Sequence, residues 1–108
     1  MVFNLESFEK FEPMLASGGI LFSDSSLVNK ISWRDDLKGT YYIPASGLAS
    51  DNDLTGMANV IMLAKMIAVT KIFEKEAFLD HMLGTIPPSK ADLIDKNRRA
   101  YNLGYSYK

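Results

Sequence analysis

The most continuous apolar stretch of the chain runs from residue 54 to residue 71, LTGMANVIMLAKMIAVTK. Its apolar residues recur at helical spacing and cover the whole circumference of a helix rather than one stripe. A helix that is apolar all round is normally buried on all sides. A membrane span is the competing interpretation, but a charge such as Lys65 near its middle would cost about 2.5 to 3.5 kcal/mol. We therefore predict a buried central helix from Leu54 to Lys71.

Two short segments predict β-strands. Residues 20–24, ILFSD, begin with apolar residues at consecutive positions, which suits a strand covered on both faces, as in a parallel sheet. Residues 40–43, TYYI, are β-branched or aromatic and are closed by Pro44. Between them, residues 29–39 have no clear periodicity and predict a surface segment on which Trp33 packs as an anchor, with ligand stacking as the alternative.

Three further helices are predicted around these strands. The first begins at Asn4 as N-cap and ends or tightens at Pro13. Residues 45–53, rich in small and acidic side chains, are read as a connection, after which Asp53 or Thr55 caps the central helix. The remaining two helices are expected from Glu74 to Leu83, closed by Gly84, and from Lys90 to about Leu103, opened by a capping box of Ser89 and Asp92 and closed by Gly104.

These elements predict an α/β fold that this chain does not complete. Two strands of four or five residues do not form an independently stable sheet. A fully apolar helix about 27 Å long also needs more covering surface than the other predicted elements provide. The chain is therefore expected to be part of a larger α/β domain or an obligate partner in an assembly.

Composition narrows the function classes. The 108 residues carry a formal net charge of −1 with both signs mixed along the chain, which argues against nucleic acid as a partner. The chain contains no cysteine, which excludes disulfides and thiolate ligation of zinc or iron–sulfur clusters by this chain alone. The N-terminus shows no secretory pattern, so a cytoplasmic location is the default expectation.

Few residues suggest chemistry. His81 is the only histidine, on a predicted helix, where a surface role is expected. Asp24 stands near a strand end, where ligand sites of α/β sheets lie, although a cap or a solvated turn explains it more simply. Asn59 is an amide on an otherwise apolar helix and loses about 1 to 3 kcal/mol if it is buried without hydrogen bonds. It is expected to contact either a neighbouring loop carbonyl or a partner subunit or ligand.

Five short patterns occur in an order that resembles the C-terminal half of the gamma-subunit domain of 2-oxoacid:ferredoxin oxidoreductases. The matching positions are Asn4 and Ser7; Gly18 and Gly19; Ile43, Pro44 and Ala45; Asn59, Met62 and Leu63; and Asn97, Ala100 and Gly104. The resemblance covers nearly the whole chain. Two features depart from it: Ala64 and Lys65 follow where the family usually has glycine, and the Gly-rich GxGGQG turn that opens the family's domain is absent.

The resemblance implies a three-layer α/β/α fold with a partial, mostly parallel sheet, and residues 1–108 as one incomplete gamma-type domain. It also implies a complex that converts a 2-oxoacid and CoA to acyl-CoA, CO2 and reduced ferredoxin. Thiamine diphosphate and [4Fe-4S] clusters would then lie on other subunits, of alpha, beta and delta type, and this chain would hold no cofactor alone.

In such a complex the chain is expected to pack against the thiamine-binding subunits and to shape the approach of substrate or CoA. The candidate ligand- or partner-contact residues are Pro44, Ala45, Ser46 and Gly47, at a strand end, and Asn59, on the helix that follows. No catalytic residue and no membrane contact are expected. The alternatives are a small-molecule-binding α/β module unrelated to 2-oxoacids and a purely structural interaction subunit.

Overall fold

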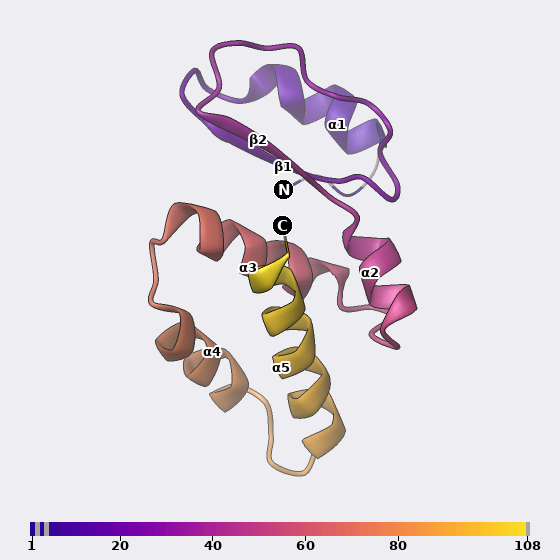
Figure 1. The fold of residues 1–108 in the computed structure, drawn as a ribbon, viewed down its shortest axis with the longest axis vertical. Coiled ribbons are helices and arrows are strands. Elements are labelled where there is room, and N and C mark those ends of the chain that lie inside the picture. The colour runs from indigo at the N-terminus through magenta and orange to yellow at the C-terminus, as the bar shows by residue number, and fades with distance from the viewer. Residues whose placement is uncertain (2, 4, 108) are drawn as a thin grey trace.

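The computed structural model describes residues 1, 3 and 5–107. Its elements in chain order are α1 Leu5–Phe11, the 3₁₀ turn η1 Glu12–Met14, β1 Ile20–Asp24, β2 Gly39–Ile43, α2 Ala45–Asp51, α3 Ala58–Thr70, α4 Lys75–Gly84 and α5 Ala91–Ser106. Figure 1 shows the strand pair between α1 on one side and α3 with α5 on the other. The predicted three-layer α/β arrangement is confirmed.

The two strands are parallel, in a register that pairs Ile20 with Gly39 and Asp24 with Ile43. Side chains of a strand alternate between the two faces of the sheet. Leu21 accordingly packs with Phe8 of α1, whereas Phe22 packs in the larger core with Ile43 and the buried residues of α2, α3 and α5. Both faces are thus covered, as the consecutive apolar residues of β1 predicted.

The larger core is centred on the contact between α3 and α5. Five residues of α3 are buried: Val60, Ile61, Met62, Ala64 and Ile67. Gly104 of α5 faces Ile61 so closely that a Cβ at position 104 would overlap its carbonyl oxygen and lie 2.8 Å from its Cα. The prediction that Gly104 ends the last helix is wrong, because α5 continues to Ser106 and the glycine serves close backbone packing.

Several predicted boundaries also differ. Residues 45–51 form α2 rather than a connection, and α3 begins only at Ala58, after a turn in which Asp53 and Gly56 have positive φ. Met57 is the N-cap of α3 and makes no side-chain cap bond, so neither Asp53 nor Thr55 caps it. Lys90, not Ser89, is the N-cap of α5, and Gly84 is the last residue of α4. The predicted cap Asn4 lies outside the described residues.

Lys65 is accommodated by the C-terminal part of the described chain. Its Nζ donates a 2.8 Å hydrogen bond to the carbonyl oxygen of Tyr107, and the residue is half-buried. The helix itself is 13 residues long. None of the helices in the described part of the chain is long and apolar enough to cross a membrane.

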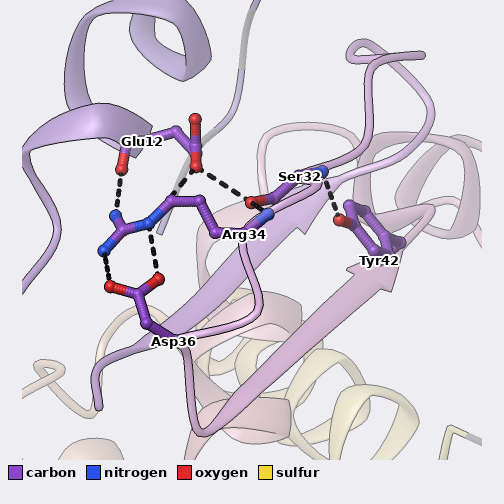
Figure 2. A network of polar contacts seen from close by, with 5 residues as sticks. All are labelled: Glu12, Ser32, Arg34, Asp36 and Tyr42. Atoms are coloured by element: carbon purple, nitrogen blue, oxygen red, sulfur yellow. Dashed lines mark hydrogen bonds and ion pairs between the residues drawn. The ribbon is translucent and has the colours of Figure 1, made fainter. Parts of the chain in front are cut away.

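The segment between the strands is held by a polar network (Figure 2). The Arg34 guanidinium donates to both carboxylate oxygens of Asp36, at 2.9 and 2.8 Å, and to the carbonyl of Glu12 at 2.8 Å. The Ser32 hydroxyl donates to the Glu12 carboxylate at 2.9 Å, and the Ser32 amide donates to the Tyr42 hydroxyl at 2.8 Å. This network fastens residues 32–36 to η1 and β2.

Trp33 does not pack as the predicted anchor. Its side chain is 87% exposed, whereas Ser32 and Arg34 on either side are half-buried. The prediction failed because the neighbouring polar side chains, not the indole, turn toward the protein.

The Arg34–Asp36 pair predicts a pH-dependent contribution to stability. The hydrogen bond from Arg34 lowers the pKa of the Asp36 carboxyl below its ordinary value of 3.8. The folded state therefore favours ionised Asp36, and this contribution is present above the ordinary pKa and lost as the pH falls through the lowered one. We expect Asp36→Asn to lower the urea midpoint slightly at neutral pH and to approach the native protein as the pH falls below the ordinary value of 3.8 and through the lowered pKa.

The control is Asp95→Asn, which changes an exposed carboxylate on α5. A deficit of the Asp36→Asn protein that persists unchanged at low pH would contradict the assignment to this ion pair.

Candidate functional site

The carboxyl end of β1 is tied to the start of α2 through a buried carboxylate. The Asp24 side chain is fully buried, and its Oδ2 accepts hydrogen bonds from the Ser46 hydroxyl at 2.6 Å and the Ser46 amide at 3.1 Å. Its Oδ1 accepts from the Ser26 amide at 3.0 Å. The Ser26 hydroxyl in turn accepts from the Gly47 amide at 2.9 Å. Asp24 is therefore a structural group and not a solvated one.

This junction explains why α2 forms where no cap is visible in the sequence around it. The N-cap of α2 is Pro44, which makes no side-chain cap bond. Orphan N–H groups at a helix start need acceptors, and a negative charge there is favourable. Asp24, which lies 22 positions before Ser46 in the sequence, supplies both the acceptor and the carboxylate.

Three of the predicted contact residues serve this junction. Pro44 occupies the N-cap position, Ala45 is fully buried, and Gly47 leaves room for Ser26, whose Oγ would lie 2.9 Å from a Cβ at position 47. Their proposed contact with a ligand or partner stays a prediction.

The other two predicted residues, Ser46 and Asn59, line one cleft of about 340 Å³ between α2 and the start of α3. Small and neutral side chains form most of its wall. The lining consists of Phe3, Ser46, Ala49, Ser50, Thr55, Gly56, Ala58 and Asn59. The fold thus brings together two residues that are 13 positions apart in the sequence.

Asn59 is exposed at the first turn of α3 rather than buried among apolar side chains. Its Oδ1 accepts a 2.9 Å hydrogen bond from the Val60 amide, which is a bond within the helix start. Among the described residues none accepts from its Nδ2, so the two amide donors are available to a ligand or another chain.

The cleft offers binding groups rather than acid–base or nucleophilic ones. Hydroxyls of Ser50 and Thr55 and the Asn59 amide line it, and no charged side chain is among its described lining residues. Elsewhere in the described chain, no group of three or more His, Asp or Glu side chains is placed to hold a metal ion. These side chains can recognise uncharged polar groups of a ligand through hydrogen bonds.

Ala49 and Ser50 were missed as lining residues because residues 45–53 were read as a connection, and Thr55 was missed because it was read as a possible cap of the central helix. One signal for α2 was present, since Ala45, Leu48 and Ala49 have the i, i+3, i+4 spacing of a helical face.

Comparison with known proteins gives consistent matches. The family described as pyruvate ferredoxin/flavodoxin oxidoreductase matches residues 1–107. The 2-oxoglutarate synthase subunit KorC of Methanocaldococcus jannaschii is 27% identical over 101 residues, which are 93% of this chain and 52% of that protein. The gamma subunit of keto/oxoacid ferredoxin oxidoreductase from Geobacter sulfurreducens PCA superposes with a TM-score of 0.79 at 27% identity, covering 96% of this chain and 60% of that one. This chain therefore spans about half the length of the curated relative.

Proposed function

Because this chain belongs to the pyruvate ferredoxin/flavodoxin oxidoreductase family, as its sequence patterns indicated, we propose that it is a gamma-type subunit, or part of one, of a cytoplasmic 2-oxoacid:ferredoxin oxidoreductase. The observation that carries the proposal is the family match over residues 1–107, supported by the gamma-subunit structure with a TM-score of 0.79. The proposed reaction converts a 2-oxoacid, CoA and oxidised ferredoxin to acyl-CoA, CO2 and reduced ferredoxin.

The sequence of this chain does not offer the ligands of the iron–sulfur clusters of that reaction. A [4Fe-4S] cluster needs cysteine thiolates, and the sequence has none. The described residues also include no group of three or more His, Asp or Glu side chains placed to hold a metal ion. We propose that thiamine diphosphate and the clusters are held by the alpha, beta and delta subunits. This chain then helps to bind and position the substrate or CoA.

The α2–α3 cleft is the part of this chain best suited to such a role. The carboxylate of a 2-oxoacid calls for a cation, and none is among the described residues that line the cleft. The amide groups of the pantetheine arm of CoA instead match the hydroxyls of Ser50 and Thr55 and the Asn59 amide. We propose that this cleft contacts CoA during its approach to the catalytic subunits.

Asn59→Ala tests the cleft within the assembled complex. One lost hydrogen bond of about 0.5 to 1.5 kcal/mol is expected to raise KM for CoA by roughly 2- to 12-fold, with KM for the 2-oxoacid unchanged. The matched control is Asn102→Ala, the same truncation on an exposed position of α5. Equal kinetics for the two variants would remove the cleft from the CoA path and favour a purely structural role.

The subunit assignment has its own test. Co-expression of the tagged chain with the alpha and beta subunits of the same organism is expected to yield a complex that reduces ferredoxin with a 2-oxoacid and CoA. A well-expressed chain that fails to join those subunits would contradict the assignment. The assignment of residues 1–108 to one incomplete domain also stays a prediction, motivated by the two-stranded sheet that the described residues form.

A further inference from the structure

Two polar side chains of the α2–α3 cleft have a fixed hydrogen-bonding polarity. Ser46 lies on the α2 wall of the cleft and Asn59 on the α3 wall. Each of them uses part of its hydrogen-bonding capacity inside the protein, and only the remainder can serve a ligand. The hydroxyls of Ser50 and Thr55 make no hydrogen bond to another described residue, so they can rotate either to donate or to accept. Ser46 and Asn59 therefore decide which ligand groups the cleft prefers.

Ser46 is held as an acceptor by Asp24. A serine hydroxyl has one proton to donate and two lone pairs that accept. The Ser46 proton is committed to Oδ2 of the fully buried Asp24 carboxylate, 2.6 Å from the Ser46 Oγ, and a carboxylate accepts without donating. The Ser46 amide donates to the same oxygen at 3.1 Å. Because no described residue donates to the Ser46 Oγ, its lone pairs remain for a ligand.

The burial of Asp24 keeps this polarity from reversing. Hydrogen bonds to an ionised group are roughly twice as strong as those between neutral groups. If the Ser46 hydroxyl turned to donate to a ligand, the buried carboxylate would lose one of its three donors, which is costly for a buried charge. Asp24 is not among the described lining residues of the cleft, so it acts on the cleft through Ser46.

Asn59 is held as a donor by the first turn of α3. Its Oδ1 accepts the 2.9 Å hydrogen bond from the Val60 amide. A backbone N–H needs an acceptor, so the side-chain oxygen of Asn59 must face Val60, and the side-chain nitrogen must face away. The two N–H groups of this nitrogen are the ones that no described residue accepts. Asn59 therefore offers donors to the cleft.

A secondary amide carries the complementary pair of groups. Its N–H donates and its carbonyl accepts, and the two lie on opposite edges of a planar trans unit. An acceptor on one wall and a donor on the other match these two edges. An ester keeps the carbonyl but replaces the N–H with an oxygen, whose lone pairs would face those of Ser46. The polarity of the cleft therefore favours an amide over an ester.

We propose that Ser46 and Asn59 together bind one secondary amide of the pantetheine arm of CoA. The Ser46 Oγ accepts from the amide N–H, and the Asn59 Nδ2 donates to the amide carbonyl. Asp24 is a positioning residue, because it holds the Ser46 hydroxyl in the accepting orientation. The inference rests on the proposed function, which brings CoA to the cleft, and it adds the group of CoA that is bound and the residue that selects it.

Two CoA analogues test this assignment in the assembled oxidoreductase complex. Each has one of the two amide N–H groups of the pantetheine arm replaced by an ester oxygen. Both analogues keep the thiol, so both remain acyl acceptors. In the complex with the native chain, kcat/KM for one analogue is expected to be roughly 5- to 150-fold below that for CoA, the range that an unpaired polar group gives.

Ser46→Ala is expected to remove most of this preference. Without the Oγ there is neither an acceptor for the amide N–H nor a repulsion against the ester oxygen. The ratio of kcat/KM for CoA to that for the same analogue should therefore fall below about threefold. Both substrates are compared on one preparation of the variant, so any partial unfolding cancels from the ratio.

Ser106→Ala is the matched control. It removes another hydroxyl that donates to an oxygen, here the carbonyl of Asn102 at 2.7 Å on an exposed part of α5. The complex with this variant should keep the native ratio, since Ser106 is not among the described residues that line the cleft.

Two results would overturn the inference and leave the proposed function in place. One is an equally strong preference for CoA in the native and Ser46→Ala complexes, which would place recognition of the amide elsewhere in the complex. The other is a native complex that uses both analogues as well as CoA. The proposed function is judged separately, by assembly of the native chain and by KM for CoA of Asn59→Ala. If those fail, the inference fails with them.

Discussion

Gly104→Ala is expected to lower the free energy of unfolding by about 3 kcal/mol, at the upper end of what an overpacked core costs. The new Cβ would overlap the carbonyl oxygen of Ile61 and lie 2.8 Å from its Cα. These are backbone atoms of α3, so the overlap is relieved only by moving α3 and α5 apart. Urea unfolding followed by circular dichroism measures the change.

Gly84→Ala is the matched control. Gly84 is the last residue of α4, and a Cβ there meets nothing within 4 Å. The same substitution should leave stability unchanged or raise it by up to about 1 kcal/mol, because alanine favours helix over glycine. If both variants lost equal stability, the close approach of α3 and α5 would not be what position 104 requires.

Asp24→Ala is expected to destabilise the protein by about 3 kcal/mol or more. The carboxylate is fully buried and accepts three hydrogen bonds, two from Ser46 and one from Ser26. Removing it leaves their donors without an acceptor, and each such loss costs about 1 to 3 kcal/mol. Thermal unfolding of the variant measures the loss, and protection of the α2 amides from hydrogen exchange should fall at the same time.

Asp35→Ala is the control, since Asp35 is an exposed aspartate close in sequence to the strands. It should change stability by no more than about 0.5 kcal/mol. Asp24→Asn keeps one acceptor oxygen and should fall between the two. An Asp24→Ala protein as stable as the Asp35→Ala protein would show that α2 does not depend on the carboxylate.

The strands could be predicted because their signals are local. Ile20–Asp24 is bounded by glycines and serines and begins with three consecutive apolar residues, and its predicted range is the observed one. The helix Ala45–Asp51 was missed despite the spacing of its apolar residues, because its small residues also suit a turn. Its decisive acceptor, Asp24, is also far away in the sequence. Gly104 was misjudged because glycine signals a helix end and a close helix crossing in the same way.

The candidate site was predictable in part for similar reasons. Ser46 was found from its place at a strand end, and Asn59 from its polarity within an apolar helix. Their meeting in one cleft depends on how α2 and α3 pack, which no local pattern contains. The exposure of Trp33 likewise depends on the hydrogen bonds of its neighbours Ser32 and Arg34.

The contact between Ile61 and Gly104 also has a consequence for the order of events during protein synthesis. The two residues are 43 positions apart, and translation covers such a distance on the order of seconds. Until α5 has left the ribosome, the apolar surface of α3 has no intramolecular cover on that side. The nascent chain therefore presents α3 to chaperones, or to subunits that are already folded, before it can complete its own core.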